Sequence, residues 1–205
     1  AHSLINAISE SDLRDIVAVM DKGFWSPANL KSLEDANIHY AMALKRDIPL
    51  IKHYSQTHYK DYFRYRDRAE WWIETEWENR KIYTYLDKSI ADQEESTYLE
   101  GVEEGRSSMK DYKRLKNRFG TLSILTDTGL SAKDVYALYK ERRDVEYAFD
   151  TLQNTLGADS TWMRSRESLQ GYLFIQFVAL HLYSQILEHL KRKDLLSQYS
   201  VRDVL

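Results

Sequence analysis

The stretch that decides the fold is Ile16-Val17-Ala18-Val19-Met20-Asp21-Lys22-Gly23-Phe24-Trp25-Ser26-Pro27. Its first five residues form a continuous apolar run, which is typical of a strand that is buried on both faces of a sheet. Ser26 followed by Pro27 predicts a helix start, because serine caps the first turn and proline lacks only an N–H that has no partner there. Asp21 is therefore expected at the carboxyl end of a buried strand.

Outward from this stretch, the pattern predicts a helix over 28–36 and a second strand over 38–44, which together make a β-α-β unit. Residues 119–126 again have a strand pattern. Ser131 and Asp134 have the spacing of a capping box, and they open a helix that is expected to reach about residue 156. A long apolar helix should follow, from Glu167 to about Arg192. The fold class is expected to be α/β (α+β), with the two long helices packed on the sheet.

Between these segments, residues 51–118 have a different character, rich in tyrosine, tryptophan and charge. Segments 61–66, 69–78 and 80–87 alternate well enough to be strands of an antiparallel ribbon. We interpret residues 51–118 as an insertion subdomain, a β ribbon plus a helical segment that stands largely outside the sheet. The core would then comprise residues 1–50 and 119–192, and 193–205 would be a C-terminal tail.

The composition sets the class of protein. The chain has 205 residues, 43% hydrophobic and 30% charged, with no cysteine and a net charge of −3. The absence of cysteine excludes disulfides and thiolate zinc sites, and the charge argues against binding nucleic acid through bulk charge alone. No signal-like start is visible, and the apolar run 169–190 contains Gln170, Gln176, His181 and Gln185. Those polar groups favour a buried helix over a membrane span.

One edge of the expected helix at 131–156 carries polar residues. On a wheel of about 100° per residue, its members lie within about 60° of one another; they are Tyr139, Arg142, Glu146 and Gln153. A carboxylate at a core edge needs a partner, and this could be a cation, a metal ion or both. The alternative is a salt-bridged amphipathic helix, just as Asp21 could merely cap the helix that follows it. Neither carboxylate alone indicates catalysis.

Together, these residues resemble insertion-sequence transposases of the DDE type. Met20-Asp21-Lys22-Gly23-Phe24-Trp25-Ser26 resembles the segment around their second catalytic aspartate, and Tyr139-x2-Arg142-x3-Glu146 resembles their Tyr-x2-Arg-x3-Glu-x6-Lys signature. Two further segments are similar to the family: Phe119-Gly120 with Ile124-Leu125-Thr126-Asp127, and Phe149 to Leu156. The resemblance covers roughly residues 1–50 and 118–192.

The resemblance implies a ribonuclease-H-like fold, here partial and carrying a β-rich insertion. Three carboxylates of such a site hold two divalent ions, Mg²⁺ or Mn²⁺, which activate the attacking oxygen and stabilise the leaving one. Asp21 and Glu146 would be metal ligands, and Tyr139 and Arg142 would contact DNA phosphate or orient Glu146. The partners would be transposon ends and target DNA, with no membrane. The active full-length assembly would be a homodimer in a prokaryotic cytoplasm, associated with the nucleoid.

Two departures from the family pattern leave alternatives open. The lysine seven residues after the glutamate is Gln153 here, which loses a charge-assisted phosphate contact. The first aspartate of the family lies on an earlier strand, yet only twenty residues precede Asp21. This aspartate is expected to be absent, so that the chain is a fragment, inactive by itself. A non-catalytic DNA-binding or interaction remnant is one alternative, and another ribonuclease-H-like nuclease or resolvase is a second.

Two further features are candidates for DNA contact. A basic run could follow a DNA backbone, or it could be a solvated helix face; it comprises Lys110, Lys113, Arg114, Lys116 and Arg118. In the expected ribbon, Trp72 shares a face with Glu70, Glu74 and Glu76. If Trp72 is exposed it could stack on a flipped base, whereas packing is the alternative role.

Overall fold

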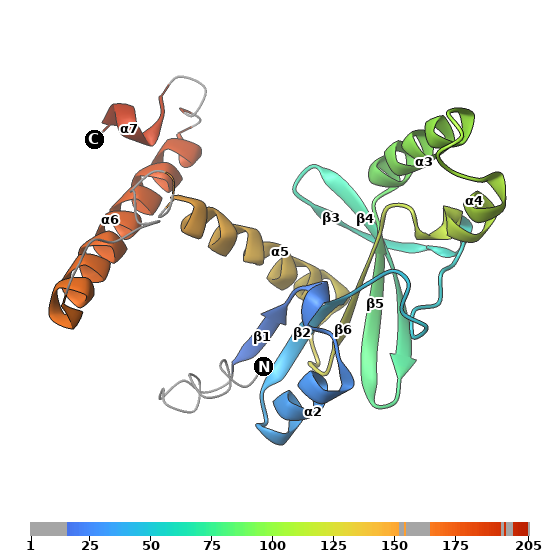
Figure 1. Cartoon of the computed structure of the whole chain (residues 1–205), viewed down its shortest axis with the longest axis horizontal. Coiled ribbons are helices and arrows are strands. Elements are labelled where there is room, and N and C mark those ends of the chain that lie inside the picture. The colour runs from blue at the N-terminus through green and yellow to red at the C-terminus, as the bar shows by residue number, and fades with distance from the viewer. Residues whose placement is uncertain (1–15, 152–153, 155–164, 194, 196–198, 205) are drawn as a thin grey trace. The chain divides into compact units, whose positions relative to one another are not determined.

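The computed structural model describes residues 16–151, 154, 165–193, 195 and 199–204 (Figure 1). The chain divides into two compact units, Ala1–Lys140 and Glu141–Leu205. Each unit is described by itself below. The first contains a mixed sheet with its helices, and the second is helical in its described part. The fold class is α+β, consistent with the expected ribonuclease-H-like domain.

The β-α-β unit is confirmed. Strand β1 (Val17–Met20) runs parallel to β2 (His39–Leu44), with Met20 opposite Met42. Helix α2 (Pro27–Asp35) connects them, and its cap is the expected one, because Ser26 Oγ accepts the Asn29 N–H at 3.1 Å. Since both strands run the same way, the chain leaves β1 and β2 at the same edge of the sheet.

Six strands form one sheet in the order β1-β2-β6-β5-β4-β3 (Figure 1). All pairs except β1 with β2 are antiparallel. The other strands are β3 (Asp61–Tyr65), β4 (Arg68–Trp77), β5 (Arg80–Leu86) and β6 (Thr121–Thr126). The prediction of strands in these segments is confirmed. The expectation that they stand outside the sheet is wrong, because β5 pairs with β6 from Lys81 to Leu86.

The reason for this correction is burial on both faces of β5. Its residues from Ile82 to Leu86 are all buried, which a ribbon standing in solvent would not allow. The hydroxyls of Thr84 and Ser123 lie 2.8 Å apart and satisfy each other between the two strands. Alternation identifies a strand but carries no information about its partner, so the sequence pattern could not place these strands in the sheet.

Two helices follow β5. Helix α3 (Lys88–Glu103) begins at Asp87, whose carboxylate accepts the N–H groups of Ser89 and Ile90. Helix α4 (Met109–Leu115) lies beside α3 (Figure 1). The first unit also contains three short 3-10 turns: η1 (Lys22–Phe24), η2 (Gln56–His58) and η3 (Lys116–Arg118). The expected helical segment within residues 51–118 is thus confirmed.

Helix α5 (Ala132–Asp150) begins at the predicted capping box, where Ser131 Oγ accepts the Asp134 N–H at 3.3 Å. Its first turns pack on the sheet through Val135 and Tyr136. The predicted continuation to residue 156 lies mostly outside the described residues. Helix α6 (Arg166–Arg192) confirms the second long helix, and α7 (Val201–Val204) follows. The packing of α6 on the sheet stays a prediction.

Within the described residues, no helix is long and apolar enough to cross a membrane.

The core of the first unit has a layer on each face of the sheet. One layer joins α2 to the strands through Leu30, Leu33, Met42 and Leu125. The other joins α5 to the strands, and Ala41, Ala43 and Ile124 leave room there for the aromatic rings of Tyr83, Tyr85 and Tyr136. Because this second layer holds the first two turns of α5 against the sheet, Val135 and Tyr139 on the inner face of those turns lie against the strands.

The second layer also holds a buried carboxylate. Glu70 on β4 is only 3% exposed, and it accepts a hydrogen bond from the Tyr136 hydroxyl. Burial raises the pKa of Glu70, and the nearby charge of Asp87 adds to this, while Tyr136, Lys140 and Arg68 oppose it in part. A carboxyl with a raised pKa in the folded state binds its proton more tightly than in the unfolded chain. It therefore stabilises the fold below its ordinary pKa, and this contribution is lost as pH rises through the folded value.

Glu70→Gln is accordingly expected to stabilise the chain at pH 7 by about 1 kcal/mol, because the amide keeps a hydrogen-bonding group and carries no charge. The advantage over the unmodified chain should shrink as the pH falls toward 4.5. Thermal unfolding followed by circular dichroism between pH 4.5 and 8 measures it. Glu76→Gln, an exposed position on the same strand, is the control. Equal pH dependence of the two variants would show that Glu70 is not the titrating group.

Candidate active site at the carboxyl ends of two parallel strands

Asp21 follows the last residue of β1 and is half-buried. Its carboxylate accepts the Lys22 N–H at 2.8 Å, so it caps the short turn η1. Strand ends of open sheets are where functional groups gather, because the backbone turns away there and leaves side chains free to converge. The capping role and a catalytic role are compatible, since the N–H bond occupies only part of the acceptor capacity of a carboxylate.

Tyr139 reaches Asp21 from the other end of the sequence. Its hydroxyl donates to Asp21 Oδ1 at 3.3 Å, across 118 residues of chain. The ring of Tyr139 is 9% exposed and belongs to the inner face of α5, four residues after Val135. Tyr139 therefore lies on the side of α5 that faces Asp21. The first residue of the Tyr-Arg-Glu signature thus contacts the aspartate at the end of β1.

The other two signature residues lie in the second unit. Arg142 Nη1 and Glu146 Oε1 are 2.8 Å apart, one helical turn from each other. The side chain of Glu146 is 57% exposed and that of Arg142 is 29% exposed. Such a pair on a helix surface stabilises the helix by only about 0.2–0.5 kcal/mol. Arg142 therefore partly neutralises Glu146 without fixing its position.

A family model described as Transposase DDE domain matches residues 1–182. The chain belongs to this family. No curated protein and no solved structure matches the chain. The match confirms the resemblance that Asp21 and the Tyr139–Glu146 signature predicted.

For a DDE transposase domain, the decisive question is whether Asp21 and Glu146 converge. Asp21 belongs to the first compact unit and Glu146 to the second, so their convergence stays a prediction. Gln153, which stands where the family has lysine, lies outside the described residues. Among the described residues, no group of three His, Cys, Asp or Glu side chains is arranged to hold a metal ion.

Trp72 packs rather than standing free. Its ring meets that of Tyr83 edge-on, with the centroids 5.8 Å apart, and it lies against the layer beneath α5. One part of Trp72 also borders an open pocket of about 480 Å³ together with Tyr54, His58 and Lys60. Trp72 therefore has the packing role. Only the part of its ring that borders the pocket could stack on a base.

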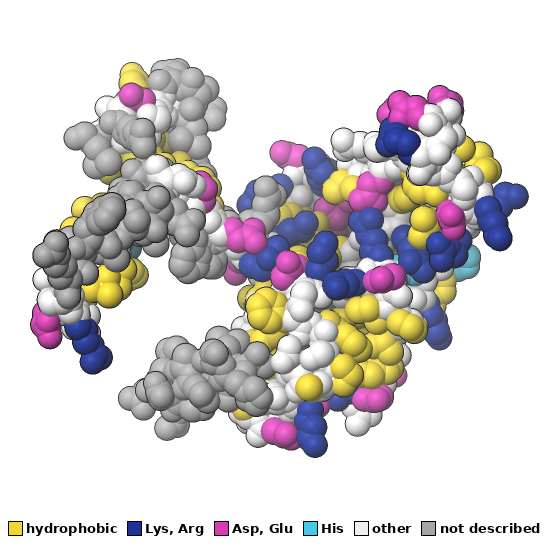
Figure 2. Space-filling view, viewed as in Figure 1, with side chains coloured by type: hydrophobic (Ala, Val, Ile, Leu, Met, Phe, Trp, Pro, Cys, Tyr) yellow, Lys and Arg dark blue, Asp and Glu magenta, His cyan; other side chains and the backbone are white. Residues whose placement is uncertain are grey.

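Lys113 and Arg114 lie on α4 and are exposed. Arg114 pairs with Asp111 at 3.0 Å, so part of its charge is already compensated. Figure 2 shows Lys and Arg side chains gathered across one face of the first unit, with acidic side chains between them. This mixed surface agrees with the net charge of −3, and it favours local contacts with phosphate over a broad basic face.

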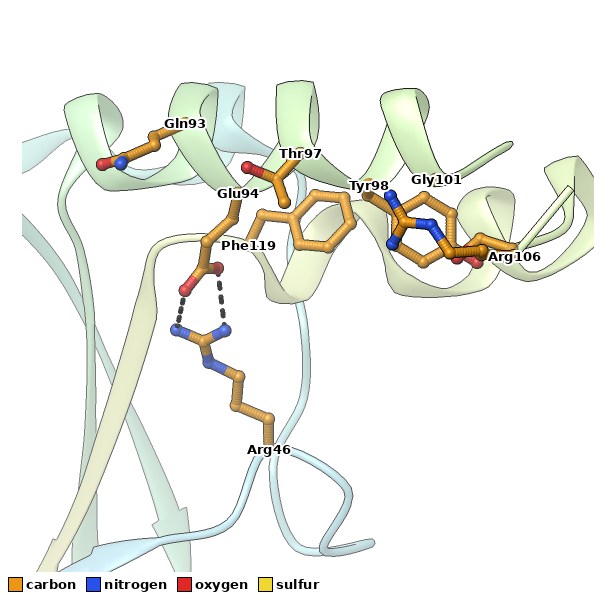
Figure 3. Close-up of a pocket in the computed structure, with 9 residues that line it drawn as sticks. Arg46, Gln93, Glu94, Thr97, Tyr98, Gly101, Arg106 and Phe119 are labelled. Atoms are coloured by element: carbon orange, nitrogen blue, oxygen red, sulfur yellow. Dashed lines mark hydrogen bonds and ion pairs between the residues drawn. The ribbon is translucent and has the colours of Figure 1, made fainter. Parts of the chain in front are cut away.

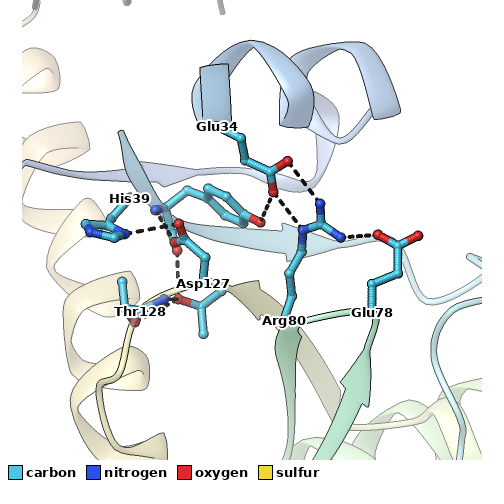
Figure 4. Close-up of polar contacts among 8 residues, drawn as sticks. Glu34, His39, Glu78, Arg80, Asp127 and Thr128 are labelled. Carbon is cyan, nitrogen blue, oxygen red and sulfur yellow. Dashed lines mark hydrogen bonds and ion pairs between the residues drawn. The ribbon is translucent and has the colours of Figure 1, made fainter. Parts of the chain in front are cut away.

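A polar network that sequence reasoning missed lies at the opposite edge of the sheet (Figure 4). Asp127 accepts from His39 Nδ1 at 3.0 Å and from the Tyr40 N–H at 2.9 Å. Arg80 holds Glu34 with Nε at 2.7 Å, which lowers the pKa of Glu34. These groups tie α2, β2, β5 and β6 together. Asp127 lies beside the first residues of β2, whereas Asp21 follows the last residue of the parallel strand β1, so Asp127 belongs to the scaffold.

A second hollow lies beneath α3 and has a volume of about 470 Å³ (Figure 3). Arg46 closes one side with two bonds to Glu94, at 2.8 and 3.1 Å, and donates through Nε to the Thr121 carbonyl. Tyr98 and Phe119 face each other with ring centroids 5.6 Å apart. Since Arg46 and Glu94 satisfy each other, we interpret this hollow as part of the join between α3 and the sheet.

Proposed function

We propose that this chain is the catalytic part of a DNA transposase that hydrolyses phosphodiester bonds at transposon ends and transfers the strand into target DNA. The observation that carries the proposal is the hydrogen bond between Tyr139 and Asp21. A helix that merely covered a sheet would have no need to bring a signature tyrosine to the aspartate at the strand end. Family membership agrees with this chemistry.

Asp21 and Glu146 would hold the divalent ions. Carboxylate oxygens are the donors that Mg²⁺ and Mn²⁺ prefer, so the residue types fit. When bound, the ions would activate the attacking oxygen and stabilise the leaving one. The residues of the chain do the rest: Tyr139 positions Asp21 through its hydroxyl, and Arg142 holds Glu146 and offsets its charge. DNA is the expected partner, and a homodimer is the proposed active assembly.

We further propose that residues 51–118 are an insertion into a core formed by 1–50 and 119–192. Strands β3, β4 and β5 would extend the sheet of the core from β6, and α4 would present Lys113 and Arg114 to DNA. The residues between Asp21 and Glu146 would then lengthen one sheet, and Asp21 would lie at the side of the sheet where β1 and β2 pair in parallel.

A second candidate function is a non-catalytic DNA-binding remnant. It is favoured by Gln153, since glutamine cannot supply the charge-assisted phosphate contact of the family lysine. The two candidates differ in the fate of the carboxylates. A remnant has no need for Asp21 and Glu146 to bind an ion, whereas a catalytic domain requires it.

Manganese binding distinguishes them. Titration of the chain with Mn²⁺, followed by electron paramagnetic resonance of the free ion, is expected to show a site that Asp21→Asn and Glu146→Gln each weaken roughly tenfold or more. Because both carboxylates would hold the same ion, the double variant should lose little more than either single one. Asp35→Asn, an exposed carboxylate on α2, is the matched control. Single variants that behave like Asp35→Asn would refute the shared site.

A further inference from the structure

A pocket of about 340 Å³ lies beyond the carboxyl ends of β1 and β2. Its walls come from the turn η1 and from the segment that follows β2, and they include Lys22, Trp25, Lys45, Asp47, Ile48 and Pro49. Because β1 and β2 are parallel and adjacent, both segments leave the sheet at the edge where Asp21 stands. Lys22 is the next residue after Asp21, so the pocket begins one residue along the chain from the candidate metal ligand.

The charge of the pocket is unbalanced. Lys22 and Lys45 are both exposed, and within the described part of the chain neither ammonium has a hydrogen bond or an ion pair. Asp47 supplies one negative charge, which leaves a net charge of +1 in the lining. Lysine ammonium groups that converge on a hollow surface attract anions more strongly than isolated ones, because the low-dielectric walls focus their field.

Trp25 adds a second, independent observation. Its indole N–H is buried and makes no hydrogen bond to any described residue. An indole nitrogen can only donate, and a buried donor without an acceptor is uncommon in folded proteins. Because this nitrogen is buried although Trp25 lines the pocket, an acceptor that enters the pocket would reach the indole N–H only after the ring turns.

We propose that this pocket binds a backbone phosphate of the DNA, next to the phosphate that reacts at Asp21. Lys22 and Lys45 supply the charge, the indole of Trp25 supplies a donor once it turns toward the pocket, and Asp47 weakens binding enough for the strand to leave. This inference rests on the proposed function, and it assigns the DNA contact to residues that the family signature does not include. A phosphate held here would fix the register of the strand relative to Asp21.

Fluorescence anisotropy with a labelled single-stranded oligonucleotide tests the proposal. Lys22→Ala and Lys45→Ala are each expected to weaken binding roughly threefold to tenfold and to reduce the slope of log K against log salt by about 0.7. Asp47→Asn should tighten binding, because it removes a repelling charge. Lys31→Ala, an exposed lysine on α2, should change neither quantity beyond the loss expected for a distant charge. Circular dichroism confirms that each variant is folded.

The outcomes separate the two claims. If the unmodified chain binds the oligonucleotide and the Lys22 and Lys45 variants match Lys31→Ala, the phosphate pocket is overturned while the proposed function stands. If the unmodified chain does not bind DNA at all, the proposed function fails and the inference fails with it. If a lysine variant does not fold, the Asp47→Asn variant tests the pocket instead. Unchanged or weaker DNA binding by Asp47→Asn would contradict a phosphate in this pocket.

Discussion

Gly120→Ala is expected to destabilise the first unit by about 3 kcal/mol. Gly120 has a φ of +66°, a conformation that costs other residues about 1–2 kcal/mol. An added Cβ would also lie 2.4 Å from the Asp87 carbonyl oxygen and 2.7 Å from the Ala91 nitrogen, and these are backbone atoms that cannot move aside cheaply. Such overpacking adds about 1–3 kcal/mol. A loss of this size is a large fraction of the stability of a typical domain.

Urea unfolding followed by tryptophan fluorescence measures this loss, because Trp25, Trp71, Trp72 and Trp77 all lie in the first unit. Gly129→Ala is the matched control, since an added Cβ there meets nothing within 4 Å and the φ of Gly129 is not positive. An unfolding midpoint for Gly120→Ala equal to that of Gly129→Ala would show that the close approach of β6 to the start of α3 is not required.

The second large effect is an absence of cleavage. The 205-residue chain is not expected to nick supercoiled DNA above background with Mg²⁺, although the family performs this chemistry. A DDE site uses three carboxylates to hold two ions, and this chain offers Asp21 and Glu146. A site with only two of the three carboxylates would bind both ions weakly. Conversion of supercoiled plasmid to the open circle, measured on agarose gels, gives the rate.

The contrary result is equally specific. Robust magnesium-dependent nicking by this chain that Glu146→Gln abolishes would show that a third ligand is present and was not recognised. Nicking that survives Glu146→Gln would indicate a contaminating nuclease and leave the expectation in place. Together with manganese binding, the assay distinguishes an incomplete catalytic site, which binds an ion without cutting, from a remnant that does neither.

Much of the fold could be predicted from local patterns. The apolar run before Asp21, the Ser26-Pro27 start and the Ser131 capping box each specify a local conformation through interactions within a few residues. These elements are found where expected. The place of β5 could not be predicted, because its pairing with β6 joins residues about 40 apart and depends on the two-sided burial that the pairing itself creates.

The candidate site divides in the same way. Helical spacing placed Tyr139, Arg142 and Glu146 on one edge, and the Arg142–Glu146 pair follows from that spacing alone. Strand alternation placed Glu70 on one face with Trp72, but its burial beneath Tyr136 depends on α5 covering that face. No sequence pattern connects Lys22 with Lys45, since each is a single lysine after a separate strand.

By itself, the sequence determined which segments are strands and helices, that Asp21 ends a buried strand, and to which family the chain belongs. Local backbone preferences and short-range capping are properties of neighbouring residues, so the order of residues contains them. Only the tertiary structure decided that β3, β4 and β5 extend one sheet, that Tyr139 bonds to Asp21, and that two lysines border one pocket. These are contacts between distant segments, and they exist only after the parallel pairing of β1 with β2 and the packing of α5 have brought those segments together.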